Sequence, residues 1–203
     1  PEMGKPLKYS LKGERTIYGM KFPGGLKKNQ KLPKPVITPT TKAESGHDLR
    51  LTEKEIIKQK IVSPKIWRQM KKVALKLFDR GSKMCAKRGI ILVDTKYEFG
   101  FDGKGKLILI DEIHTPDSSR FWIRKTYRQR FNKGLEPENF DKEFLRLWYA
   151  KRGYKGDGKP PRMPQSLVNA VSRRYIQIYK KITGKNPKFD NKISYVLIKE
   201  SLN

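Results

Sequence analysis

The spacing of apolar residues predicts two consecutive helices in the first half of the chain. The apolar residues of segment 1–35 recur with no sustained period, and we expect this segment to be extended or to form loops. Thr52 and Glu55 stand three residues apart in the capping-box pattern that starts a helix. Ser63-Pro64 predicts the start of a longer helix, since serine is a favoured N-cap and proline fits the first helical position. The residues that define its apolar stripe and its end are Ile66, Met70, Val73, Leu77 and Gly89.

A change to continuous apolar runs then predicts two strands. Residues 90–93 (Ile-Ile-Leu-Val) and 107–110 (Leu-Ile-Leu-Ile) are short, apolar and largely β-branched. Residues 102–105, Asp-Gly-Lys-Gly, are typical of a turn. We therefore expect residues 90–98 and 106–112 to pair as an antiparallel hairpin of two mostly buried strands.

The last third of the chain returns to helical spacing. A helix is expected at residues 141–150, a Gly/Pro loop at 156–164, and a final helix from Pro164-Gln165 to a stop at Gly184. Helices flanking a mostly antiparallel sheet predict an α+β fold. The expected division is a basic extended segment at 1–24, one domain at 25–184 and a basic tail at 185–203.

Net charge is the unusual property of the composition. Lysine and arginine number 47 against 20 acidic residues, a formal charge of +27. Such a surface attracts polyanions without reading their sequence, although a lysine-rich surface is also compatible with simple solvation. Tyr127 and Phe131 stand among cations, where they would stack on bases or pack inward. The candidate RNA-binding cations are Arg124, Lys125, Arg128 and Arg130, with Lys5, Lys8, Lys12 and Arg15 in an extended arm.

The single cysteine and the absence of long apolar runs limit the cellular compartments in which we expect the protein. Cys85 excludes an intramolecular disulfide and lies in a helical pattern, where a buried thiol is more common than a nucleophile. No apolar run approaches the roughly 20 residues that span a bilayer, and no secretory signal is recognisable. We expect a reducing compartment and no membrane partner.

Charged residues gather where the predicted strands end. Asp94, Lys96 and Glu98 alternate, so on a strand they share one face. In the predicted hairpin Asp111 would lie near them. Because Mg²⁺ prefers one or two carboxylates plus phosphate oxygens, the group suits a divalent cation and a phosphorylated ligand. A solvated ladder of charges is the alternative.

Two polar segments have the composition of ligand loops. Residues 115–120, Thr-Pro-Asp-Ser-Ser-Arg, offer hydroxyls and an arginine that can bind phosphate bidentately, although the same residues also make ordinary turns. Residues 38–48 combine hydroxyls, both charge signs and a histidine. His47 titrates in the range of a general base, but a loop histidine is more often a hydrogen-bonding or surface residue.

Taken together, these segments resemble one enzyme family. Residues 92–100, Leu-Val-Asp-Thr-Lys-Tyr-Glu-Phe-Gly, are similar to the strand signature of phosphoribosylaminoimidazole-succinocarboxamide (SAICAR) synthases. The resemblance runs from about residue 25 to residue 184 and implies the second lobe of that fold. Further segments that resemble the family, in its order, are 38–48, 110–122, 139–148 and 153–164.

The resemblance implies an activity and roles for particular residues. Family members join L-aspartate to the carboxylate of carboxyaminoimidazole ribonucleotide (CAIR), using ATP and Mg²⁺ through an acyl phosphate. By resemblance, Asp94 and Lys96 act beside the nucleotide substrate, and Glu98 and Asp111 serve ATP and the metal. The implied substrate-binding residues are Lys42, Glu44, Asp48, Ser119 and Arg120.

The resemblance does not extend to the family's N-terminal ATP-binding lobe, so different functions stay open. One is a cytoplasmic ligase whose missing lobe is supplied elsewhere, with this chain alone inactive. The other is a ligase homologue recruited as a basic, RNA-binding subunit of a ribonucleoprotein such as a mitochondrial ribosome. A metabolite-binding regulator that keeps the CAIR pocket is a third, less favoured alternative.

Overall fold

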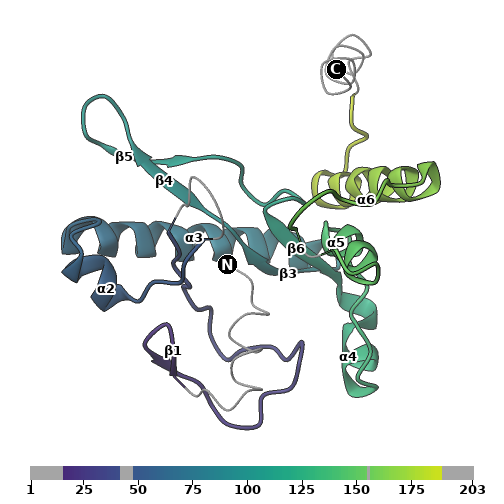
Figure 1. Ribbon diagram of the computed structural model, residues 1–203, viewed down its shortest axis with the longest axis horizontal. Helices are drawn as coiled ribbons and strands as arrows, with labels where there is room; N and C mark the ends of the chain where they lie inside the picture. Colours follow the sequence, from purple (N-terminus) through teal and green to yellow (C-terminus); the bar gives the residue numbers. More distant parts are fainter. Residues whose placement is uncertain (1–15, 42–47, 155, 189–203) are drawn as a thin grey trace.

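The computed structural model describes residues 16–41, 48–154 and 156–188, and they form helices beside short antiparallel strands (Figure 1). This confirms the predicted α+β class. The elements in chain order are β1 (Thr16–Ile17), β2 (Met20–Lys21), α2 (Glu53–Lys58), α3 (Pro64–Lys87), β3 (Ile90–Thr95), β4 (Glu98–Phe101), β5 (Leu107–Ile110), β6 (Ser119–Ile123), α4 (Arg124–Asn132), α5 (Glu143–Ala150) and α6 (Gln165–Thr183).

Local capping signals set the helix ends as the sequence predicts. At the start of α2 the Glu55 amide donates to Thr52 Oγ1 at 3.2 Å, and the Thr52 amide donates to Glu55 Oε2 at 2.6 Å. Each bond satisfies a backbone donor that a helix start would leave unpaired. At α3 the hydroxyl of Ser63 accepts from the amide of Ile66. At the other end of the fold, Gly184 closes α6 in the left-handed conformation, with φ of 73°.

The predicted pairing of strands is wrong in one respect. The turn at residues 102–105 joins β4 to β5, with Phe101 opposite Leu107, whereas β3 pairs antiparallel with β6. The chain leaves β3 after Thr95 and starts a new strand, β4, at Glu98. The turn at residues 102–105 therefore follows β4 and not β3. Because β3 is buried along most of its length, it pairs inside the fold, against a strand that comes later in the sequence.

The main core lies between α3, the β3–β6 pair and α6. It contains Cys85 from α3, Ile90 from β3, Phe121 from β6 and Ile178 from α6. The thiol of Cys85 is buried as predicted, and burial raises its pKa to about 11. A thiol held neutral in this way packs as a small apolar group.

A smaller core forms near the start of the described chain. Ile17, Tyr18, Phe22 and Leu26 bury one another around the β1–β2 hairpin. Within the segment predicted to be extended, Ile17, Tyr18 and Phe22 are therefore buried, and the predicted division into domains stays a prediction. The rest of that predicted segment, with Lys5, Lys8, Lys12 and Arg15, lies outside the described residues, as do residues 189–203 of the predicted tail.

The β4–β5 hairpin forms a narrow ribbon that reaches away from the main core (Figure 1). Of its side chains, Phe101 is 51% exposed, Ile108 36% and Ile110 38%. We call this pair of strands the apolar ribbon. Among the described residues, no helix is both long and apolar enough to cross a membrane.

Candidate functional site

A β-bulge brings the first two predicted site residues together. The register of the β3–β6 pair shifts between Leu92 and Asp94, so that Asp94 stands opposite Arg120. Arg120 donates from Nε to Asp94 Oδ1 at 2.9 Å, and its Nη2 forms an ion pair with Asp94 Oδ2. A bulge re-aims side chains in this way. Asp94 consequently pairs with β6 and does not share an open face with Lys96 and Glu98.

Acidic groups surround the Arg120 guanidinium. Burial lowers its pKa, but the hydrogen bond and charge of Asp94, aided by Glu143 and Asp141, outweigh burial and raise it. The three hydrogen bonds to Asp94 use Nε and Nη2, so Nη1 is the guanidinium nitrogen that this pairing does not use. The arginine is held in place by its neighbours before any ligand arrives.

Lys96 forms the centre of a second cluster. Its amine lies 2.6 Å from Glu98 Oε1. The hydrogen bond to Glu98 is the main cause of a raised pKa, and the charges of Glu98, Asp48 and Asp111 add to it although burial opposes it. Lys96 is therefore a firmly protonated cation, suited to stabilise negative charge and unsuited to accept a proton.

The three carboxylates whose charges raise the pKa of Lys96 come from separate segments. Glu98 starts β4 and pairs with Ile110, so Asp111 follows directly beside it. Asp48 belongs to a loop whose ends meet through the bridge between Thr40 and Arg50. The sequence predicted Glu98 and Asp111 as neighbours on the basis of a different strand pairing, and the β4–β5 pair brings them together instead.

The connection from β5 to β6 is tightly turned and fixed by its hydroxyls. Asp111 and His114 have positive φ angles of 67° and 53°, a conformation that is uncommon outside glycine. The Ser118 amide donates to Thr115 Oγ1 at 3.2 Å, and the Ser119 amide donates to the Thr115 carbonyl at 2.9 Å. This loop leads directly into Arg120, so its hydrogen bonds fix the backbone position from which the arginine side chain extends.

Ser119 occupies a different place from the one that an exposed phosphate clamp requires. It is 4% exposed, and its hydroxyl donates to Thr95 Oγ1 at 2.8 Å. Of the predicted pair, Ser119 is buried and the Arg120 side chain is 19% exposed.

A buried clamp holds the two site segments against α3. The ring of His114 lies on the backbone of Gly81, where an added Cβ would be 2.2 Å from Cε1 of the ring. The Tyr97 hydroxyl and His114 Nε2 are 2.5 Å apart. Burial lowers the pKa of His114 and raises that of Tyr97, so both stay neutral near pH 7. Tyr97 follows Lys96 directly, which ties the lysine segment to the β5–β6 connection.

Asp141 is a buried residue near the site that the sequence analysis missed. It is 1% exposed, and its carboxylate accepts from the amides of Phe121 at 2.8 Å and Glu143 at 2.9 Å. It thereby joins the strand of Arg120 to the start of α5. Its only sequence signal was an acidic residue at the start of the helix predicted at residues 141–150.

Asp141 should make stability depend on pH. Burial is the largest cause that raises its pKa, from 3.8 to about 6. A pKa raised in the folded state means that the stabilisation is fully present below pH 3.8 and is lost as pH rises through about 6. Relative to Asp141→Asn, the wild-type free energy of unfolding should fall by roughly 3 kcal/mol between about pH 4 and pH 7. Urea unfolding across that range measures it, and parallel curves for the two proteins would contradict it.

Several predicted residues lie outside the described part of the chain or outside the site. Lys42, Glu44 and His47 are not described, so their roles stay predictions. Among the described residues, no group of three or more His, Cys, Asp or Glu side chains is placed to hold a metal ion. Glu98 and Asp111 would supply two carboxylates, which matches the donor set of a magnesium ion that also binds phosphate oxygens.

The predicted RNA-binding cations lie on α4, whose aromatic residues face inward. Tyr127 stacks between Trp122 and Phe131, and its hydroxyl donates to the carbonyl of Asn29 at 2.7 Å. Arg130 donates to the carbonyl of Glu136 at 2.6 Å. The remaining candidates Arg124, Lys125 and Arg128 are exposed, but no aromatic ring of α4 is presented for stacking on bases.

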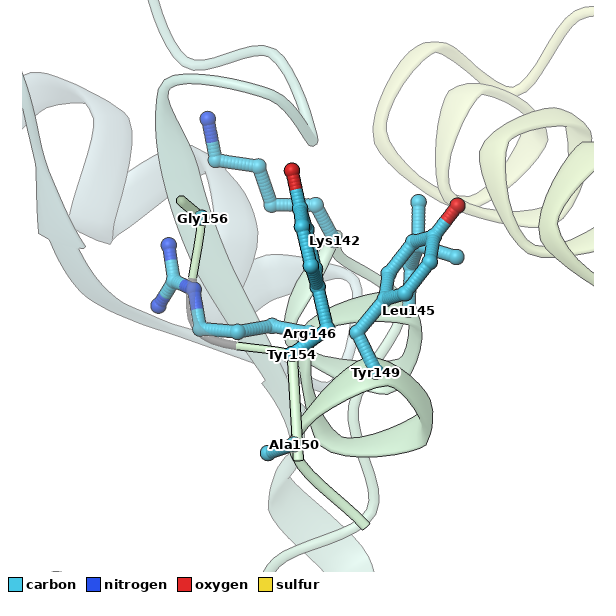
Figure 2. Close-up of a pocket in the computed structure, with 7 residues that line it drawn as sticks. All are labelled: Lys142, Leu145, Arg146, Tyr149, Ala150, Tyr154 and Gly156. Atoms are coloured by element: carbon cyan, nitrogen blue, oxygen red, sulfur yellow. The ribbon is translucent and has the colours of Figure 1, made fainter. Parts of the chain in front are cut away.

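A shallow hollow of about 440 Å³ lies beside α5 (Figure 2). Figure 2 shows its two tyrosine rings side by side, with both cationic side chains on the same side of them. Lys142 also pairs with Asp117 at 3.4 Å, which connects the hollow to the β5–β6 connection. The lining residues are Lys142, Leu145, Arg146, Tyr149, Ala150, Tyr154 and Gly156, and none was predicted from the sequence.

Comparisons with known proteins point to one family. A family model described as SAICAR synthetase matches residues 8–163. The phosphoribosylaminoimidazole-succinocarboxamide synthase of Legionella pneumophila (strain Paris) is 50% identical over 182 residues, and that of Bacteroides thetaiotaomicron is 47% identical over 175. These alignments cover 89% and 85% of this chain, and 58% and 55% of the two relatives.

Solved structures give the same result. The SAICAR synthase of Saccharomyces cerevisiae, complexed with SAICAR, superposes with a TM-score of 0.74 at 34% identity, covering 92% of this chain and 58% of that one. A SAICAR synthetase in complex with ADP superposes with a TM-score of 0.60 at 31% identity, covering 81% and 57%. The chain thus spans somewhat more than half the length of the relatives it matches.

Proposed function

The chain belongs to the SAICAR synthetase family, and on that premise we propose that it forms the substrate side of an ATP-dependent ligase that joins L-aspartate to CAIR. One observation carries the proposal: Lys96, held protonated, lies among carboxylates from three separate segments, Asp48, Glu98 and Asp111. The ion pair joins Glu98, whose side chain is 11% exposed, to a half-exposed Lys96, so the cost of removing the Glu98 carboxylate from water opposes the stability that the pair adds.

The cationic residues are assigned to the negative charge of the substrates. Lys96 faces the carboxylate of CAIR, where an ammonium ion stabilises the charge that develops when the amide bond forms. Arg120 binds the CAIR phosphate through its Nη1 edge, since arginine suits phosphate geometry. Asp94 orients that guanidinium, and Ser119 fixes its strand through Thr95. The yeast relative solved with SAICAR supports a ligand of this class.

The carboxylates are assigned to ATP and its metal. Glu98 and Asp111 lie together at the base of the apolar ribbon, and two carboxylates with phosphate oxygens make an ordinary magnesium site. The ion would neutralise phosphate charge there. The relative solved with ADP supports a nucleotide in this family. Lys42, Glu44 and Asp48 complete the proposal as the loop that contacts the substrates.

The other function suggested by the sequence, a subunit of an RNA-containing assembly, receives no support from the comparisons. The relatives found are named as synthases, and the aromatic residues of α4 are used in packing.

Binding of the product tests the proposal. Calorimetry with SAICAR and Mg-ADP should show binding to the wild-type chain, and Lys96→Met should weaken it by about tenfold or more. Lys104→Met, which removes an exposed lysine from the turn of the apolar ribbon, should leave it unchanged. The assignment would be refuted if the wild-type protein does not bind SAICAR, or if Lys96→Met and Lys104→Met bind it equally.

A further inference from the structure

The exposed face of α3 carries a row of cations that runs along the helix. The acid on this face is Asp79, which pairs with Lys83 at 2.6 Å. Every cation of the row is solvent-exposed, and successive members are three or four residues apart. The row, which we call the α3 cationic face, consists of Lys65, Arg68, Lys72, Lys76, Arg80, Lys83 and Lys87.

Helix geometry aligns these residues in one direction. At 3.6 residues per turn they fall within a sector of roughly 120°, and Lys65 to Lys87 spans about 33 Å. The opposite side of α3 contributes Trp67, Gly81 and Cys85 to the buried interior. In Figure 1 α3 is one continuous helix across the molecule, so the row is straight.

Neither the fold nor the proposed ligase site accounts for this face. The core uses the other side of the helix, and none of the proposed substrate or metal residues lies on α3. Lys83 pairs with Asp79, but the other cations of the row have like-charged neighbours three or four residues away, and their repulsion destabilises the helix.

We propose that the α3 cationic face binds the phosphate backbone of a nucleic-acid duplex without reading its sequence. A duplex carries one negative charge per about 1.7 Å of its axis. A stretch as long as the row therefore offers about twenty phosphates, enough to neutralise every cation of the face. The overall charge of +27 attracts such a polyanion toward the protein from every side. The row then provides one surface on which it binds.

An anionic membrane fits this face less well. Helices that lie in a membrane interface bury large apolar side chains at the centre of the contact. The apolar side of α3 is packed in the interior, and its exposed Leu75 and Met84 flank the row without forming part of it. The row itself offers only charge, which is the requirement for contact with phosphates.

The α3 face also suits a duplex better than α4 does. α4 has nine residues against 24 in α3. Arg130 is engaged with the carbonyl of Glu136 and lies 3.9 Å from Glu138. The exposed cations of α4 therefore form a shorter and partly neutralised group, which makes them a natural control.

Fluorescence anisotropy with a labelled RNA duplex of arbitrary sequence, about ten to twenty base pairs long, provides the test. The test variant combines Lys65→Gln, Lys72→Gln, Lys76→Gln and Arg80→Gln. The control variant combines Arg124→Gln, Lys125→Gln, Arg128→Gln and Lys133→Gln, and removes the same charge from exposed positions on and just after α4. Urea unfolding of both variants establishes that each is folded.

We expect the test variant to bind about 30-fold more weakly at low salt, and the control about threefold. From about 50 to 200 mM salt, the slope of log affinity against log salt should be smaller by about three to four in the test variant, since each lost phosphate contact removes about 0.9. Equal losses in the two variants would mean diffuse attraction and overturn the proposal. So would a wild-type protein that binds anionic lipid vesicles more tightly than the duplex, or that distinguishes two unrelated duplex sequences by more than about tenfold.

Discussion

Replacing Arg120 with alanine should lower the free energy of unfolding by about 3 kcal/mol, the range measured when one partner is removed from a buried ion pair. The loss comes less from the missing attraction than from Asp94, which is 7% exposed and would be left charged without its partner arginine. Urea denaturation of the wild type and the variant at pH 7 measures the difference.

A double-mutant cycle separates this effect from lost packing. If the lost ion pair with the buried carboxylate is the cause, adding Asp94→Asn to Arg120→Ala should restore about 1–2 kcal/mol, because the second change removes the buried charge. The exposed pair Lys83–Asp79 is a suitable control, with side chains 73% and 60% exposed. Breaking that pair should cost at most about 0.5 kcal/mol. Additive losses at Asp94 and Arg120 would show that the two side chains act independently.

Replacing Gly81 with alanine should destabilise the protein by about 2 kcal/mol, although alanine normally stabilises a helix relative to glycine by about 1 kcal/mol. The sign reverses because the new Cβ would stand 2.2 Å from Cε1 and 2.6 Å from Nδ1 of the His114 ring. The ring cannot simply move, since His114 also contacts the Tyr97 hydroxyl. Thermal or urea unfolding gives the result.

The matching control removes the His114 ring that the new Cβ would meet. In a His114→Ala background, Gly81→Ala should become neutral or stabilising, because the obstacle is gone and the helix preference of alanine remains. If Gly81→Ala destabilises the wild type and the His114→Ala variant equally, the cause lies in the helix and not in the contact with His114.

The helices could be predicted because their signals are local. The Thr52–Glu55 capping box, the Ser63-Pro64 start and the Gly184 end each depend on a few neighbouring residues. α4 was missed because its N-cap, Ile123, makes no side-chain capping bond and its residues are mostly polar. Without a start signal or an apolar stripe, its cations looked like a basic surface segment.

Strand pairing could not be read from the sequence in the same way. The turn at residues 102–105 was recognised, but a buried apolar strand such as β3 carries no mark of its partner. β6 begins with Ser119 and Arg120, which look like a polar loop, and the bulge that sets Asp94 against Arg120 has no sequence signature. The pairing of Asp94 with Arg120 across β3 and β6 was not predicted, and the shared role of Glu98 and Asp111 stays a prediction.

The apolar ribbon has a further consequence, for the behaviour of the polypeptide in solution. Within the described residues β4 and β5 form a sheet of only two strands, so each has an open edge with unpaired backbone groups. Open edges beside apolar side chains such as Phe101 and Ile108 are templates for intermolecular strand addition. Lys104 and Lys106 lie at the tip, where their charge opposes stacking of one ribbon on another. The lysines thus act as gatekeepers, and the chain relies on like-charge repulsion to stay dispersed wherever the ribbon is uncovered.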